Sequence, residues 1–179
     1  MTRLRILAFV GLLALAAATY AAATPDGSMR GAAEEGHTVL MKDDCDPRDP
    51  GWNNVGGCHQ HRGNVSFAEF NGEADSPLAA AVIGHQAWRN DPTYLVIKHG
   101  QRVQVRNVGG RPHTFTEVAN FGGGVVPPLN EGLIPAPECP DSLEVLPGGR
   151  VHVSGLTIGN HRFQCCFHPW MRALIKVKN

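Results

Sequence analysis

The residues best suited to bind a metal lie close together near the C-terminus. Cys165, His168 and Met171 follow one another at three-residue steps. A thiolate, an imidazole and a thioether are soft donors, which favour copper over hard cations such as magnesium or calcium. Two histidines and one cysteine in a trigonal arrangement, with a weak axial methionine, form a copper ligand set that suits one-electron transfer. His113, upstream in the segment Pro112–Phe115, can supply the second imidazole.

These residues and their flanks resemble a known family. The loop from Cys165 to Met171 follows the strand-like segment 160–163 and precedes the strand-like segment 174–177. In this loop and in His113 the chain resembles the cupredoxins, the type 1 blue-copper proteins, with a ligand loop most like that of amicyanin and plastocyanin-like proteins. The resemblance covers residues 94–179. It implies a Greek-key β-sandwich that holds one type 1 copper.

The resemblance also implies a role for each ligand. The metal ligands would be His113, Cys165, His168 and Met171, with Met171 as the long axial ligand. The outer ring edge of His168 would be exposed and serve as the electron port. The second ring nitrogen of His113 would find a backbone or loop acceptor that fixes the ring.

The sequence departs from the family pattern at three positions beside the ligands. Thr114 stands where many members have asparagine, Cys166 where threonine or serine is usual, and Ala173 where amicyanin-like loops have glycine. None of these changes removes a ligand. In the family the residue at position 114 donates its backbone N–H to the cysteine sulfur, which threonine can also do.

Five cysteines are present, so one copper ligand leaves an even number for disulfide bonds. Four cysteines allow three pairings. We expect Cys45 to pair with Cys58 in a local loop. We expect Cys139 to pair with Cys166, because successive side chains on a strand face opposite ways and Cys166 must point away from the metal.

A second metal site is an alternative use of one cysteine-rich segment. Cys58-His59-Gln60-His61 lies near His37 and Cys45 in the sequence. The spacing matches no zinc signature, and the context is rich in glycine. We therefore interpret these histidines as solvated loop residues.

The N-terminus has the pattern of a secretory signal. Arg3 and Arg5 precede an apolar run over 6–18, and three alanines at 21–23 offer a cleavage site. The alternative is a retained membrane anchor, but the run is short for a spanning helix. We expect residues 1–23 to be removed and the mature protein to be periplasmic or secreted. Without Arg3 and Arg5 the 16 basic residues become 14 against 16 acidic ones, which leaves no basic field for nucleic acid.

The rest of the chain reads as a loop-rich β protein, with 21 glycines and 13 prolines. We expect an extended or disordered N-terminal arm over 24–64 and one copper-binding domain over 65–179. The alternation of apolar residues predicts strands at 65–70, 94–98, 102–107, 143–146, 151–153, 160–165 and 173–177. The strands 94–98 and 102–107 are expected to form a hairpin, and 77–84 a short helix opened by Ser76-Pro77. The fold class is therefore an all-β Greek-key sandwich with a loop-rich arm and one short helix.

Together these features predict an exported one-electron carrier that is not an enzyme and has no substrate pocket. Its partners would be redox proteins that dock transiently on an apolar patch around His168, Trp170 and the loop 121–135. We expect a monomer with no membrane span in the mature chain. The alternative is a periplasmic copper chaperone or storage protein, but such proteins favour methionine-rich sites and only four methionines are present. A multicopper oxidase would need several His-x-His motifs, and the chain has one.

Overall fold

The computed structural model describes residues 37–74 and 84–179. The expected signal segment 1–23, the first part of the expected arm and most of the expected helix 77–84 lie outside these residues. The elements, in chain order, are β1 (Thr38–Lys42), the 3-10 helix η1 (Pro50–Val55), α1 (Phe67–Ala74), β2 (Arg89–Asp91), β3 (Tyr94–Lys98), β4 (Val103–Asn107), β5 (His113–Thr114), β6 (Thr116–Val118), the 3-10 helix η2 (Pro127–Leu129), β7 (Glu144–Val145), β8 (Arg150–Val153), β9 (Gly159–Gln164) and β10 (Arg172–Lys178). No helix in the described ranges is long and apolar enough to cross a membrane.

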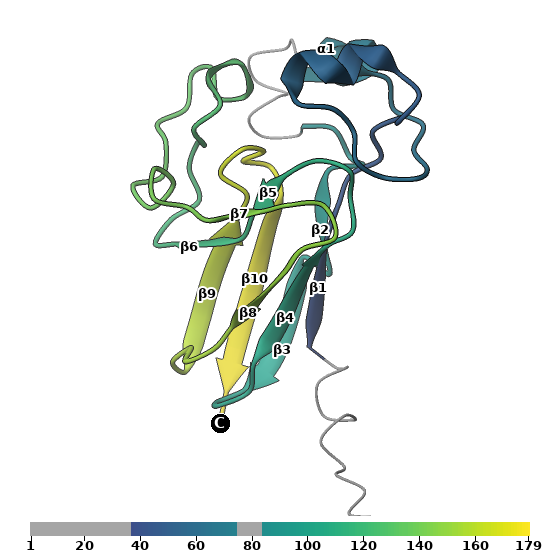
Figure 1. Cartoon of the computed structure of the whole chain (residues 1–179). Coiled ribbons are helices and arrows are strands. Elements are labelled where there is room, and N and C mark those ends of the chain that lie inside the picture. Colours follow the sequence, from purple (N-terminus) through teal and green to yellow (C-terminus); the bar gives the residue numbers. More distant parts are fainter. Residues whose placement is uncertain (1–36, 75–83) are drawn as a thin grey trace, which may run out of the picture.

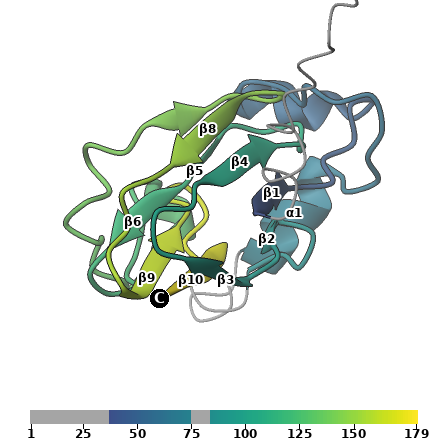
Figure 2. The same cartoon turned by 90° about the horizontal axis from the view of Figure 1, so that it is seen from below.

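Two four-stranded sheets form the two layers of a sandwich (Figure 2). The first sheet has the order β2-β1-β4-β8 and the second has the order β3-β10-β9-β6. Each contains one parallel pair, β1 with β4 and β3 with β10, and antiparallel pairs elsewhere. The short strands β5 and β7 pair with each other near one end of the sandwich. The predicted all-β sandwich is the fold observed.

The core lies between the sheets because each strand turns its alternate apolar side chains inward. Val39 and Met41 of β1 and Val103 and Val105 of β4 pack in one cluster with the inward residues of β9 and β10. All four of these side chains are buried. The loops that follow β1, β4 and β9 meet at the end of the sandwich that carries α1 (Figure 1).

The prediction of an arm over 24–64 is wrong for the part of that segment that the structure describes. β1 lies between β2 and β4 inside the first sheet. Cys45 and Trp52 are also buried in the core. The strand was missed because it is only five residues long and directly precedes the turn-rich segment 43–57. The domain therefore begins upstream of residue 65.

The predicted strand 65–70 is also wrong, because α1 begins at Phe67. The Ser66 hydroxyl accepts a hydrogen bond from the Glu69 N–H, as a helix cap does. Phe67 and Phe70, three positions apart, both contact the Trp52 ring. Their spacing suits one face of a helix, and burial against Trp52 selects it over the strand.

The predicted hairpin of 94–98 with 102–107 does not form, although both strands exist. β3 pairs with β10 in the second sheet and β4 pairs with β1 and β8 in the first. Ile97 and Val103 approach the same core from opposite layers. The tight turn between them therefore crosses from one sheet to the other.

Candidate metal centre

The centre forms where the β5 strand meets the loop between β9 and β10. His113, Cys165 and His168 each offer one donor atom, and these atoms all lie within 4.8 Å of one another. The Cys165 Sγ lies 3.8 Å from Nδ1 of His113 and 3.6 Å from Nδ1 of His168. With metal–sulfur and metal–nitrogen bonds of about 2.3 and 2.0 Å in a trigonal site, sulfur and nitrogen would stand about 3.7 Å apart. The donor atoms are therefore spaced for one metal ion.

Met171 lies in the same loop and is fully buried. Its N–H donates to the His168 carbonyl at 2.9 Å, and its carbonyl accepts from the Cys165 N–H at 3.0 Å. The same carbonyl accepts from the side-chain amide of Asn90 on β2 at 3.1 Å. These bonds close the loop from Cys165 to Met171 and tie it to the first sheet.

The sulfur of Cys165 has a backbone donor as well. The N–H of Thr114 points at Cys165 Sγ from 3.4 Å, as the resemblance implied. The Thr114 hydroxyl accepts from the Cys166 N–H at 2.7 Å. Thr114 therefore joins the two ligand segments through both its backbone and its side chain.

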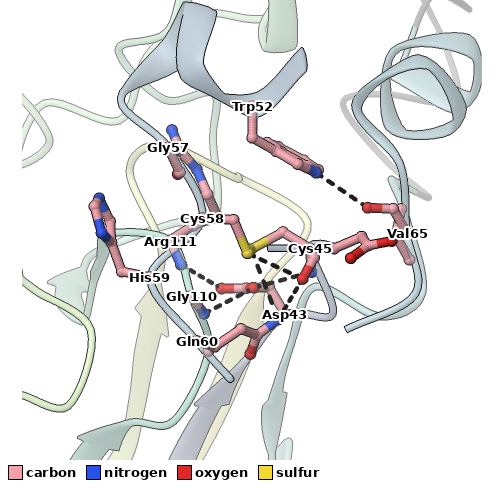
Figure 3. The surroundings of a disulfide bond; sticks show 12 residues. Asp43, Cys45, Trp52, Gly57, Cys58, His59, Gln60, Val65, Gly110 and Arg111 are labelled. Atoms are coloured by element: carbon pink, nitrogen blue, oxygen red, sulfur yellow. Dashed lines mark hydrogen bonds between the residues drawn. A yellow bond between two sulfur atoms is a disulfide. The ribbon is translucent and has the colours of Figure 1, made fainter. Parts of the chain in front are cut away.

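Asp43 is the functional residue that the sequence did not reveal. Its carboxylate Oδ2 accepts from Nε2 of His113 at 2.8 Å, and both side chains are fully buried. The backbone N–H groups of Gly110 and Arg111 donate to the same carboxylate at 2.9 Å each (Figure 3). The acceptor expected behind His113 is thus a carboxylate, which follows β1 directly.

The surroundings of Asp43 are fixed by a disulfide bond. Cys45 and Cys58 are joined, as predicted, and the Gln60 side chain donates to the Cys45 carbonyl at 2.7 Å. Figure 3 shows this bond beside Asp43 and Gly110. A side chain on Gly109 would collide with the Asp43 carboxylate, so glycine is required for this close approach.

The second predicted disulfide, Cys139 with Cys166, is also present. It attaches the long loop after β6 to the residue next to Cys165. The Val125 N–H donates to the Cys166 carbonyl at 2.7 Å, which fastens the same loop again. Cys165 is the one free cysteine of the described chain.

Burial and hydrogen bonds oppose each other at the ionisable groups of this centre. Burial would raise the pKa of the Cys165 thiol, but the two facing imidazoles hold that pKa well below its ordinary value. Burial would also raise the pKa of Asp43, and the His113 ring with two backbone N–H groups lowers it instead. For His168 burial dominates and lowers the pKa. Burial lowers the pKa of His113, but its hydrogen bonds to Asp43 and Cys165 raise that pKa to about 9. Without a metal the centre thus favours a thiolate, a protonated His113 and a neutral His168, and a metal that binds Nδ1 of His113 must displace a proton.

The expected electron port at His168 needs correction. His168 is only 8% exposed. The ring of Trp170 lies 5.5 Å from its ring, and those of Phe70 and Trp88 lie 6.2 and 6.4 Å away. The segment that contains α1, inserted between β1 and β2, therefore encloses the imidazole that the resemblance placed at the surface.

The alternative metal site around Cys58 is not formed. Cys45 and Cys58 are used in the disulfide, and His59 Nε2 contacts the Gly56 carbonyl at 2.8 Å. Among the described residues, the only other group of potential ligands combines Glu69, Glu73 and His85. Both of its carboxylates are exposed, and it holds no soft donor.

No family model and no curated protein matches the chain. Among solved structures, a purple cupredoxin from Nitrosopumilus maritimus is 17% identical over 79% of this chain and 99% of its own, with a TM-score of 0.44. A reduced amicyanin variant is 23% identical over 48% and 70%, with a TM-score of 0.34, and an oxidised amicyanin variant is 19% identical over 50% and 73%, with a TM-score of 0.37. All three TM-scores are below 0.5, so no functional conclusion follows from these likenesses. In this chain the loop from Cys165 to Met171 joins β9 and β10, which are antiparallel neighbours in the second sheet of the sandwich.

Proposed function

We propose that the protein binds one type 1 copper ion and acts as a one-electron carrier. The observation that supports this most is the buried cluster in which Nδ1 of His113 and Nδ1 of His168 both face Cys165 Sγ. Two imidazoles and a thiolate suit copper, and the absence of a carboxylate from the ligand set disfavours hard cations. Bound copper would supply a centre that accepts and releases a single electron.

The residues around the cluster would hold the ligands in one geometry for both oxidation states. Asp43 orients the His113 ring. Thr114 supports the sulfur, and Asn90 fixes the carbonyl of Met171. A ligand set with such support rearranges little when the charge on the metal changes, which favours fast electron transfer. Met171 is proposed as the axial ligand because it is buried in the closed loop that also carries Cys165 and His168.

The burial of the ligands supports a carrier over a copper chaperone or storage protein. His113 and Cys165 are completely enclosed, whereas delivery of copper needs ligands that a partner can reach. We propose that redox proteins are the partners. Export to the periplasm or beyond is proposed from the signal pattern at 1–23, and the two disulfide bonds fit an oxidising compartment.

The test is copper titration followed by voltammetry on the loaded protein. We expect one copper ion per chain and a reversible one-electron wave. Binding of zinc in preference to copper, or a copper complex that shows no reversible wave, would contradict the proposal.

A further inference from the structure

A groove of about 730 Å³ opens beside the metal centre, where we had expected no pocket. One wall comes from η1 and α1, with Trp52, Phe67 and Phe70, and the other from the loop after β6 and the ligand loop, with Val126, Leu129 and Phe167. This volume lies within the range of small-molecule sites, which are mainly apolar with a few polar groups. Trp52 and Arg111, which both line the groove, are drawn near the Cys45–Cys58 disulfide in Figure 3.

His168 lines this groove and brings a polar atom to it. Its Nδ1 is turned to Cys165 Sγ at 3.6 Å, so its other ring nitrogen, Nε2, points away from the centre. Within the described part of the chain, Nε2 has no hydrogen-bond partner. It is also not one of the completely buried polar atoms without a partner, so it keeps some access to the groove. With 92% of the residue buried, the groove is where Nε2 can meet a ligand. When a metal holds Nδ1, the proton is on Nε2, which is then a hydrogen-bond donor.

The charges of the groove oppose each other. Arg111 and Glu144 both line it. The Arg111 guanidinium already donates to the carbonyls of Val55 and Gly57 and lies over the Trp52 ring. The positive charge of Arg111 and the negative charge of Glu144 cancel, and the Arg111 guanidinium already has hydrogen-bond partners. The groove therefore has no net charge that would attract an ion, and a neutral ligand fits best.

We propose that the groove binds a small neutral aromatic molecule whose oxygen atom hydrogen-bonds to Nε2 of His168, a ligand of the phenol and quinone class. The aromatic ring would pack against Phe67 and Phe167, the partly exposed aromatic side chains of the groove walls, and the oxygen would lie at the bottom of the groove. A flat protein surface cannot reach this position, because His168 is recessed behind Phe70, Trp88 and Trp170. The direction of the hydrogen bond rests on the proposed copper site, whereas the packing of the ring does not.

The test uses 1-naphthol as the probe and the indole N–H signals of the protein in nuclear magnetic resonance. Trp52 donates its indole N–H to the Val65 carbonyl at 3.1 Å and lines the groove, so its signal is a local reporter. Both the copper-free and the reduced copper(I) protein are diamagnetic and can be titrated. We expect 1-naphthol to shift the Trp52 signal in a saturable way. It should bind about two- to tenfold more tightly than 1-methylnaphthalene, which has a similar shape without the oxygen.

Variants separate this groove from nonspecific contact. Val55→Phe with Asn71→Phe places bulk at the groove from two exposed positions on η1 and α1 and should weaken binding at least about tenfold, which is 1.4 kcal/mol. Ile158→Phe, at an exposed turn outside the groove, is the matched control and should bind normally. Equal binding by all three proteins, or no shift at Trp52, would overturn the proposal. Equal affinity for 1-naphthol and 1-methylnaphthalene would overturn the role of His168. Naphthol binding by a protein that fails to take up copper would refute the proposed function and leave the groove site standing.

Discussion

At the scale of single residues, the members of the proposed metal centre differ in how far the sequence reveals them. Cys165, His168 and Met171 lie in one short loop, so their spacing alone indicates a metal site. His113 is identified through the resemblance. Asp43 gives no such signal, because it meets His113 across 70 positions only when β1 joins the sheet.

The first prediction concerns Asp43. Asp43→Asn keeps the size of the side chain but removes a negative charge that would stabilise copper(II), so the reduction potential should rise. The new amide group would also face backbone N–H donors, which should lower the free energy of unfolding by about 1–3 kcal/mol. Voltammetry and urea unfolding measure the two effects.

Asp44→Asn is the control, because it removes the same charge one residue away without touching His113. We expect a smaller rise in potential and little loss of stability. Equal shifts of the potential in both variants would show that Asp43 acts only through its charge and does not orient the ring.

At the scale of elements, the strands of four or more residues were predicted well, except for β1. β4 and β10 lie within one residue of their expected bounds. α1 was missed because a short apolar alternation fits a strand and a helix alike until Phe67 and Phe70 meet Trp52. The sheet assignment of β3 and β4 was missed because pairing depends on distant strands, which local pattern does not encode.

The second prediction concerns the disulfide that holds the loop after β6. Replacing both Cys139 and Cys166 by serine removes a disulfide bond between residues 27 positions apart. This should lower the free energy of unfolding by about 2–4 kcal/mol. Copper binding and colour should persist, because neither residue is among the proposed ligands. Chemical unfolding and a visible spectrum measure this. Loss of colour in Cys166→Ser but not in Cys165→Ser would show that the thiolate has been assigned to the wrong residue.

The third prediction concerns pH and the pair of His161 on β9 with Glu117 on β6. Burial lowers the pKa of His161, but the Glu117 carboxylate at 2.6 Å and the Thr157 carbonyl at 2.8 Å raise it above its ordinary value of 6.5. The stabilisation is therefore complete below pH 6.5 and is lost as pH rises through the raised pKa. We expect a loss of under about 1 kcal/mol, since Glu117 is half exposed. Urea unfolding measured across this pH range tests the prediction. Glu117→Gln is the control and should remove the pH dependence. A stability that rises with pH only when Glu117 is present would contradict the prediction.

At the scale of the whole molecule, the segment before residue 65 belongs to the domain. β1 contributes Val39 and Met41 to the core, and the residues that follow it, Asp43 and Cys45, support the candidate metal centre. The domain boundary expected at residue 65 would therefore separate β1 and Asp43 from the sheet and the candidate centre that they support.

The fourth prediction follows from this dependence. A chain that begins at Val65 should not fold, because β2 and β4 lose the strand that joins them. A chain that begins at His37 should fold. Amide signal dispersion in nuclear magnetic resonance distinguishes the two, and a folded protein from the shorter chain would show that β1 is dispensable.

The central claim is that Cys165 binds copper as a thiolate with two imidazoles, and the visible absorption spectrum of the copper(II)-loaded protein tests it most directly. We predict an intense thiolate-to-copper band toward the red end of the spectrum and a narrow copper hyperfine splitting in electron paramagnetic resonance. Both features should vanish in Cys165→Ser, while the circular dichroism of the β-sandwich remains. A loaded protein without that band, or one in which Cys165→Ser leaves the band unchanged, would contradict the account.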